Sequence, residues 1–143
     1  MTKENLLIEC LKVRKAFEDA AKHNMLPDQR FYLFPCGTCL ISTLVLAQHL
    51  QRFDDKDAFL IVSGENQNTS HAWLEYDRYI IDVTADQFPE IDEPVYITTD
   101  RKFHSQFQYE RSASIFSEYT LTCDERTLFH YICENIDQKV QNT

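Results

Sequence analysis

The stretch HAWLEYDRYIIDVT, residues 71–84, constrains the fold more than any other part of this chain. Two short runs of mainly aromatic, β-branched and other apolar residues, 71–76 and 79–84, flank the dipeptide Asp-Arg. Such a pattern predicts two antiparallel strands joined by a tight turn. Because side chains alternate along a strand, a symmetric turn places His71 and Asp82 on the same face of the hairpin. The sheet is therefore expected to carry an imidazole and a carboxylate side by side.

His71 and Asp82 would be diagonal neighbours, with about 7 Å between their Cα atoms, a distance that two polar side chains can bridge. An acid within so apolar a strand costs free energy unless a partner compensates for its burial. A carboxylate that bonds one imidazole nitrogen fixes the tautomer and leaves the other nitrogen to take a thiol proton. The pattern favours a functional pair. The alternative is a half-buried histidine and an aspartate that caps a turn.

Residues 4–23 have apolar side chains at helical spacing, which predicts a first helix. Leu7 and Leu11 are expected on its apolar face. Arg14 and Lys15 are expected on its charged face. A proline soon after this segment ends the helix.

Apolar runs further along the chain predict a second helix, further strands and a last helix. Residues 39–50 leave little polar surface, so this helix should be buried on most sides. Residues 58–64 and 94–99 are typical of strands, and the pattern at 122–125 resembles a capping box that starts a last helix. The order indicates an α+β fold with an antiparallel sheet. The rest of residues 89–121 gives no assignment.

The composition of residues 1–143 fits one folded domain, since 43% of them are hydrophobic and 26% are charged. The net charge of −9 argues against a nucleic-acid partner, because such proteins usually carry a basic patch. No apolar run approaches the roughly 18 residues of a membrane span, and the N-terminus lacks the apolar segment of a secretory signal. We therefore expect a cytoplasmic protein, or an effector or toxin delivered without a standard signal peptide, and no membrane partner. The sequence does not predict an oligomeric state.

The five cysteines are an odd number, which favours free thiols over a disulfide framework in a chain without a secretory signal. Cys36 and Cys39 form a CxxC motif, which is typical of thiol–disulfide exchange or of zinc binding. A zinc site with His71 would need a fourth ligand, and the second CxxC that would support it is missing. Cys39 also begins the predicted buried helix, where the helix dipole stabilises a thiolate and free N–H groups face an oxyanion. Cys39 is therefore a candidate nucleophile.

Cys39, His71 and Asp82 stand in an ordered set of motifs that resembles the transglutaminase-like branch of the papain-like cysteine hydrolases. The motifs are Gly-Thr-Cys at a helix start, the strand FLIVSG, HAWLE, and DVTADQF, and they lie within residues 34–88. Small bacterial proteins and secreted toxins or effectors of this superfamily have a similar arrangement. The resemblance implies a papain-like or transglutaminase-like core, in which an antiparallel sheet packs on the helix that carries Cys39.

The resemblance also implies a chemistry and a substrate class. Cys39 would be the nucleophile, His71 the general base and acid, and Asp82 the residue that orients His71. The family transfers an acyl group from a carboxamide, in proteolysis, deamidation of Gln or Asn, or cross-linking to an amine. A protein or peptide with a carboxamide is the implied partner, with no cofactor and no metal. Gln87 would donate a hydrogen bond to the oxyanion or the substrate, or else be a surface residue, and Trp73 would wall the site or pack in the core.

Cys36 is not part of the family pattern. It would be neutral, or it would act as a redox guard by forming a disulfide that switches Cys39 off. Two other functions remain open. A thiol–disulfide oxidoreductase would use Cys36 and Cys39, although a helix and not a strand precedes them and the pair of His71 and Asp82 would be unexplained. The second open function is a non-catalytic binding domain on the same scaffold, whose acidic charge would suit a basic partner.

Overall fold

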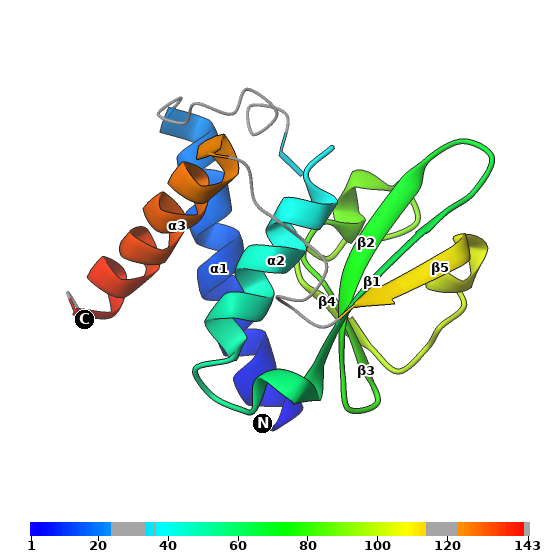
Figure 1. The fold of residues 1–143 in the computed structure, drawn as a ribbon, viewed down its shortest axis with the longest axis horizontal. Coiled ribbons are helices and arrows are strands. Elements are labelled where there is room, and N and C mark those ends of the chain that lie inside the picture. The colour runs from blue at the N-terminus through cyan, green and yellow to red at the C-terminus, as the bar shows by residue number, and fades with distance from the viewer. Residues whose placement is uncertain (24–33, 36, 114–122, 142–143) are drawn as a thin grey trace.

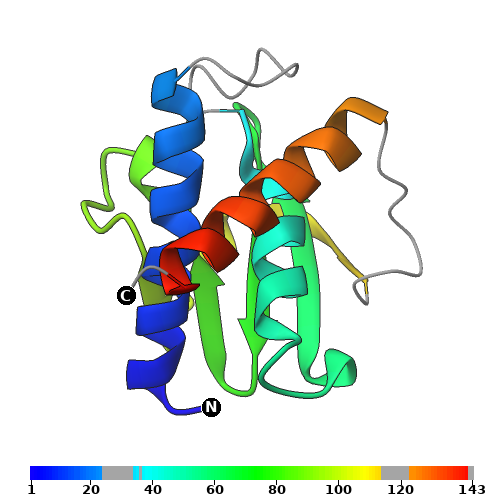
Figure 2. The same cartoon turned by 90° about the vertical axis from the view of Figure 1, so that its left-hand side faces the viewer.

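Figures 1 and 2 show helices gathered on one face of a single sheet. The computed structural model describes residues 1–23, 34–35, 37–113 and 123–141. Within these residues the α-helices are α1 (Lys3–His23), α2 (Cys39–Leu50) and α3 (Cys123–Gln141). The helices predicted at 4–23 and 39–50 are confirmed, and so is a last helix. Thr122 of the predicted capping box lies outside the described residues.

The strands pair antiparallel throughout the sheet, in the order β4-β3-β2-β1-β5. They are β1 (Phe59–Glu65), β2 (Ser70–Tyr76), β3 (Tyr79–Asp82), β4 (Tyr96–Thr98, predicted at 94–99) and β5 (Gln108–Ala113). The predicted α+β class with an antiparallel sheet is therefore confirmed. The β2–β3 hairpin has the predicted symmetric register, with Glu75 opposite Ile80 and Tyr76 opposite Tyr79.

Two stretches differ from the sequence-based expectation. β3 ends at Asp82 and not at residue 84, because the Thr84 N–H donates to Asp82 Oδ1 at 3.1 Å and a 3₁₀ turn, η3 (Ala85–Gln87), follows. The region without an assignment contains a second 3₁₀ turn, η4 (His104–Gln106), and strand β5, which pairs with β1. A short 3₁₀ turn, and a strand whose partner is distant in the sequence, leave little periodic pattern by which the local sequence could predict them.

The two faces of the sheet have different packing partners. Leu74 and Ile81, opposite each other in β2 and β3, join the core under the helices. Trp73 and Ile80 belong instead to a second aromatic-rich cluster with Val62, Phe88, Phe103 and Phe107. Because side chains alternate along a strand, His71 and Asp82 lie on the face of this second cluster.

The turn before α2 explains the glycine of the Gly-Thr-Cys motif. Gly37 has a φ of +73°, a left-handed conformation that other residues rarely adopt. A Cβ at this position would meet nothing within 4 Å, so the backbone angle and not crowding requires glycine. The Thr38 hydroxyl donates to the Pro35 carbonyl at 3.1 Å and tightens the turn. Beyond it, most of α2 is buried, as predicted.

α1 packs on the core through a different face from the predicted one. Leu7 and Leu11 are 40% and 44% exposed, and Arg14 is only 7% exposed. The buried stripe also repeats at helical spacing, and consists of Leu6, Cys10, Val13, Ala16, Phe17 and Ala20. The predicted face is wrong because two apolar stripes run along this helix, and contacts with distant segments decide which one is buried.

Arg14 links two segments that flank the predicted site. Its guanidinium makes a two-pronged ion pair with Asp86, at 2.7 and 2.8 Å, and donates to the Val83 carbonyl at 2.8 Å. Its Cζ atom lies 4.7 Å from the ring centre of Phe34, within the range of a cation–π contact. Arg14 therefore ties the DVTADQF motif to α1 and to the start of the turn that precedes α2.

Replacing Arg14 with methionine is expected to lower the free energy of unfolding by about 2–4 kcal/mol, because Asp86 would stay partly buried without its cation. Urea denaturation measures this change. Lys15→Met, a matched substitution at the exposed neighbour on the same helix, should change the free energy by less than about 0.5 kcal/mol. A loss below about 1 kcal/mol for Arg14→Met would mean that the ion pair is no better than hydration of the separate charges.

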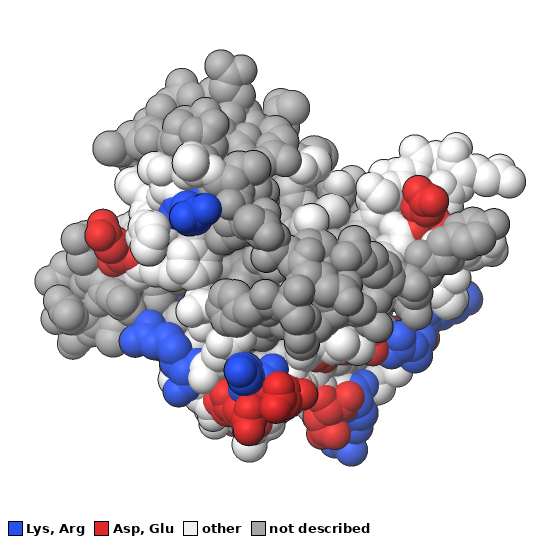
Figure 3. Space-filling model, in the orientation of Figure 1, with Lys and Arg blue, Asp and Glu red and all other residues white. Residues whose placement is uncertain are grey.

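Charged side chains of both signs lie side by side along the lower part of the face shown in Figure 3. Among the described residues of this face, the net negative charge is thus not gathered into one acidic patch. No described helix is long and apolar enough to cross a membrane. The expected absence of nucleic-acid and membrane partners stays a prediction.

Candidate active site

Two strand ends bring His71 and Asp82 together. His71 is the second residue of β2, and Asp82 is the last residue of β3. The Nε2 atom of His71 lies 2.6 Å from Asp82 Oδ2, a short distance typical of a charge-assisted hydrogen bond. Both residues are 1% exposed. The side chains that the alternation in the hairpin places on one face are therefore in direct contact.

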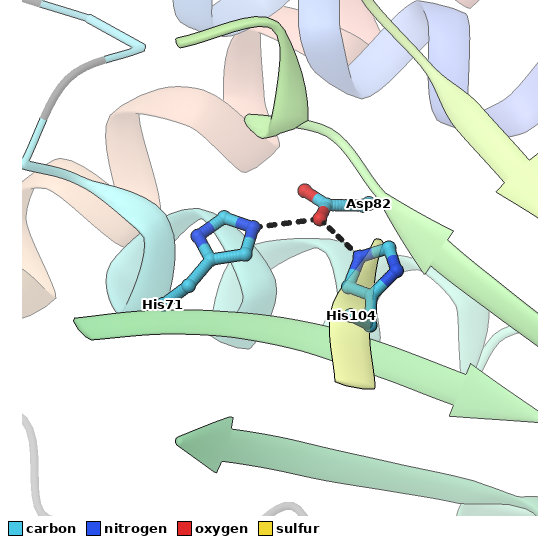
Figure 4. Close-up of side chains that lie close together, drawn as sticks. All are labelled: His71, Asp82 and His104. Carbon is cyan, nitrogen blue, oxygen red and sulfur yellow. Dashed lines mark hydrogen bonds and ion pairs between the residues drawn. The ribbon is translucent and has the colours of Figure 1, made fainter. Parts of the chain in front are cut away.

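His104 approaches the same carboxylate from the other side, as Figure 4 shows. Its Nε2 atom lies 2.7 Å from Asp82 Oδ2, and it is also 1% exposed. The other oxygen, Oδ1, accepts the Thr84 N–H. Asp82 thus accepts hydrogen bonds from two imidazoles and one backbone amide.

The charges in this cluster shift the pKa values of His71 and Asp82 in opposite directions. Burial raises the pKa of Asp82, but the charge of His71 and the hydrogen bonds from His104 and His71 outweigh burial and lower it to about 2. Burial lowers the pKa of His71, but the charge and hydrogen bond of Asp82, together with Cys39, raise it to about 9. At neutral pH the pair is therefore expected to be an imidazolium and a carboxylate.

Cys39, the first residue of α2, affects the pKa of His71. It is a free, partly exposed thiol, and both hydrogen bonding and charge from Cys39 contribute to the raised pKa of His71. Since Nε2 of His71 is bonded to Asp82, Nδ1 is the nitrogen left for a thiol. This atom is buried and makes no hydrogen bond of standard geometry within the described part of the chain. The arrangement thus leaves one imidazole nitrogen unoccupied on a ring whose pKa a free thiol affects.

His71, Asp82 and His104 are also a candidate set of metal ligands, since their ligand atoms lie within 4.8 Å of one another. The distances fit hydrogen bonds better. Two ligands of a tetrahedral zinc ion are about 3.3 Å apart when each lies about 2.0 Å from the metal. The two imidazole nitrogens instead lie 2.6 and 2.7 Å from one carboxylate oxygen. The atoms would have to separate before an ion fitted between them.

Aromatic side chains enclose the His71 ring. Phe88 meets it edge-on, with 4.9 Å between ring centres, and Phe107 lies at 5.3 Å. Trp73 is fully buried with its ring centre 5.9 Å from that of His71, so it is a core residue beside His71, and its role as a wall of the active site stays a prediction. Gly64, opposite His71 in the β1–β2 pairing, leaves room for this packing, because a Cβ there would lie 3.0 Å from the Phe107 carbonyl oxygen.

Of the other two predicted site residues, the structure describes only Gln87. The Gln87 side-chain amide donates to the Thr84 carbonyl at 3.0 Å, so it stabilises the turn after Asp82. Its predicted role toward an oxyanion or substrate stays a prediction. Cys36 lies outside the described residues.

No motif in the sequence selects His104, which stands in the region without an assignment. A histidine between aromatic residues, as in KFHSQF, is equally typical of an ordinary core segment. Asp82 gives an indirect signal, because a buried carboxylate needs partners for both of its oxygens and one histidine supplies only one. The Thr84 N–H satisfies the second oxygen, so this signal does not lead to His104, which shares Oδ2 with His71.

No protein-family model, curated protein or solved structure has significant similarity to this chain. The resemblance to the transglutaminase-like branch therefore rests on the ordered motifs of the sequence alone. The activity that this resemblance implies is a proposal.

Proposed function

We propose that this protein is a cysteine-dependent acyl-transfer enzyme that acts on a carboxamide, with Cys39 as its nucleophile. The observation that carries the proposal is the buried His71 ring, which bonds Asp82 through Nε2 at 2.6 Å, leaves Nδ1 without a partner among the described residues, and has a raised pKa to which Cys39 contributes. A thiol beside an imidazolium loses its proton more readily, and the thiolate is the reactive form. The same arrangement, on a helix that packs against an antiparallel sheet, supports the proposal of a papain-like core.

The proposed reaction starts when the Cys39 thiolate attacks the carbonyl carbon of the carboxamide. The first N–H groups of α2 have no acceptor within the helix and would stabilise the oxyanion that forms. His71 then gives its Nδ1 proton to the leaving nitrogen as the C–N bond breaks, which leaves a thioester on Cys39. Water or an amine attacks the thioester, His71 takes the proton of the attacking group, and the thiolate leaves. The product is a carboxylic acid or a new amide.

A polar cleft at the loop between β1 and β2 would suit a polypeptide substrate. Its volume is about 570 Å³, and it is lined by Glu65, Asn66, Gln67, Asn68, Gln106 and Gln108. Glu65 pairs with Ser70, the residue before His71 in β2, and Gln106 belongs to η4 with His104. Cys39, His71 and Asp82 are not among the residues that line the cleft. Amide and carboxylate side chains along a cleft suit the regularly spaced donors and acceptors of a peptide backbone.

The test is to incubate the protein with a panel of Gln- and Asn-rich proteins, with and without a biotin-linked primary amine, and to record intact masses. We expect one of three changes that depend on Cys39: conversion of an amide to an acid, incorporation of the amine, or cleavage of the chain. The exposed thiol of Cys123 provides an internal reference for alkylation. An unchanged panel, together with a Cys39 that is alkylated no faster than Cys123 at neutral pH, would contradict the proposal.

The same measurements separate the alternative functions. An oxidoreductase would reduce a disulfide-containing protein and would need Cys36 as well as Cys39. The described residues before α2 contain no strand, so they lack the strand–helix unit in which such a CxxC usually stands. A non-catalytic binding domain would leave every protein unchanged and would not require a reactive Cys39.

A further inference from the structure

Asp82 has two histidine partners, although the proposed reaction uses only one. Its Oδ2 atom accepts hydrogen bonds from Nε2 of His71 at 2.6 Å and from Nε2 of His104 at 2.7 Å. Figure 4 shows the two rings on opposite sides of the carboxylate. All three residues are 1% exposed, so water does not satisfy them. A second imidazole on one buried oxygen therefore needs an explanation of its own.

The chain fixes His104 through contacts that do not involve Asp82. Its ring packs on Trp73 with 4.7 Å between ring centres and stacks with Tyr96 at 6.1 Å. Arg101, which precedes it by three residues, forms a two-pronged ion pair with Glu75 at 2.9 and 3.1 Å. Because Glu75 and Trp73 belong to β2 and Tyr96 to β4, His104 is held against strands on either side of β3.

A carboxylate that was bonded to His71 alone would have no fixed orientation during the reaction. The His71 ring gains and loses a proton in the proposed cycle, so its bond to Asp82 alternates between strong and weak. His104 takes no part in that proton transfer. An imidazole with a proton on Nε2 donates from that atom whether the ring is neutral or charged. Together with the Thr84 N–H, it gives each oxygen of Asp82 one constant donor.

We propose that His104 is a positioning residue of the site, which holds Asp82 Oδ2 so that His71 keeps Nε2–H toward Asp82 and Nδ1 toward Cys39. The proposal rests on the acyl-transfer function above and adds a fourth member to its site. Other titratable groups that face His104 include Glu75 and Tyr96.

The test compares two substitutions of His104. His104→Phe keeps a packed ring but lacks the N–H donor, and His104→Gln offers an amide nitrogen in place of Nε2. The readout is the second-order rate of Cys39 alkylation by chloroacetate as a function of pH. This reagent requires no knowledge of the substrate, and its negative charge makes it sensitive to the His71 imidazolium.

In His104→Phe we expect the alkylation rate at neutral pH to fall by about 10-fold to 100-fold, the factor that a hydrogen bond to a charged group provides. The alkaline limb of the profile, which reports His71, should move to lower pH. His104→Gln should stay within about threefold of the wild-type rate and keep the position of that limb. Thermal unfolding of both variants serves as the control. A substitution that only weakens packing would lower the unfolding temperature but would not move the alkaline limb of the alkylation profile. A His104→Phe profile that superimposes on the wild type, or an equal loss in both variants, would overturn the proposal.

Should His104→Phe not fold, NMR of the wild-type protein with ¹⁵N-labelled histidine decides the question. We expect a hydrogen-bonded proton on Nε2 of both His71 and His104, and we expect both signals to shift in Asp82→Asn. A His104 whose proton resides on Nδ1 would overturn the proposal. This result does not depend on whether Cys39 is a nucleophile. Failure of the His104 proposal is therefore distinguishable from failure of the acyl-transfer proposal, which an unreactive Cys39 would show.

Discussion

Replacing Cys39 with alanine is expected to abolish the conversion of carboxamides, with a loss on the order of 10³-fold or more. His71 can activate and reprotonate a nucleophile but cannot replace it, so without the sulfur no thioester forms. Alanine is the best helix former, and Cys39 lies at a partly exposed helix start, so the substitution should leave the fold intact. Intact-mass analysis of the converted protein measures the loss, and circular dichroism checks the fold.

Two other cysteines provide matched controls for this result. Cys36→Ala should retain most of the activity, because the proposed reaction needs one thiol, and it should also resist inactivation by oxidation if Cys36 is the redox guard. Cys123→Ala changes an exposed thiol at the start of α3 and should have no effect. A comparable loss in Cys36→Ala and Cys39→Ala would contradict the acyl-transfer proposal and favour thiol–disulfide exchange.

The contact between His71 and Asp82 is the part of the site that local sequence rules could predict. The two residues are 11 positions apart, and a two-residue turn fixes the register between their strands. Alternation then determines which side chains share a face, without any knowledge of the rest of the fold. The start of α2 at Cys39 was predictable for a similar reason, since a glycine and an apolar run mark it in the sequence. In the structure that glycine, Gly37, has the left-handed conformation.

His104 and Arg14 were not predictable in this way, because their partners depend on how distant segments pack. His104 bonds a residue 22 positions away, and Arg14 forms its ion pair with Asp86, 72 positions away. No periodic pattern connects such positions. An arginine on an amphipathic helix usually faces solvent, and a histidine between aromatic residues is usually part of a core, so typical behaviour argued against both roles. His104 bonds the last residue of β3 and Arg14 bonds residues just after it, so this end of the strand is held by two distant segments.

Replacing Asp82 with asparagine is expected to lower activity by about 10²-fold to 10⁴-fold, the range that positioned acid–base groups contribute. The charge and hydrogen bond of Asp82 raise the pKa of His71, whereas burial lowers it. Without that charge, the buried imidazole should be neutral at neutral pH, so the thiolate of Cys39 would lose its counter-ion. The rate of Cys39 alkylation by chloroacetate at neutral pH, and the turnover of any substrate that the protein panel identifies, measure this loss.

The same substitution should change how stability depends on pH. The raised pKa of His71 contributes stability that is complete below its ordinary value of 6.5 and is lost as pH rises through about 9. The lowered pKa of Asp82 contributes stability that is present above its ordinary value of 3.8 and is lost as pH falls through about 2. On the alkaline side the wild type should therefore lose on the order of 3 kcal/mol, and Asp82→Asn should lose much less. Asp77→Asn is the matched control, since it makes the same change at an exposed turn residue of the same hairpin, whose φ of 53° asparagine tolerates. Urea denaturation from below pH 6.5 to above pH 9 measures the difference. An equal dependence of stability on pH in the wild type and Asp82→Asn would mean that the buried pair is not ionised.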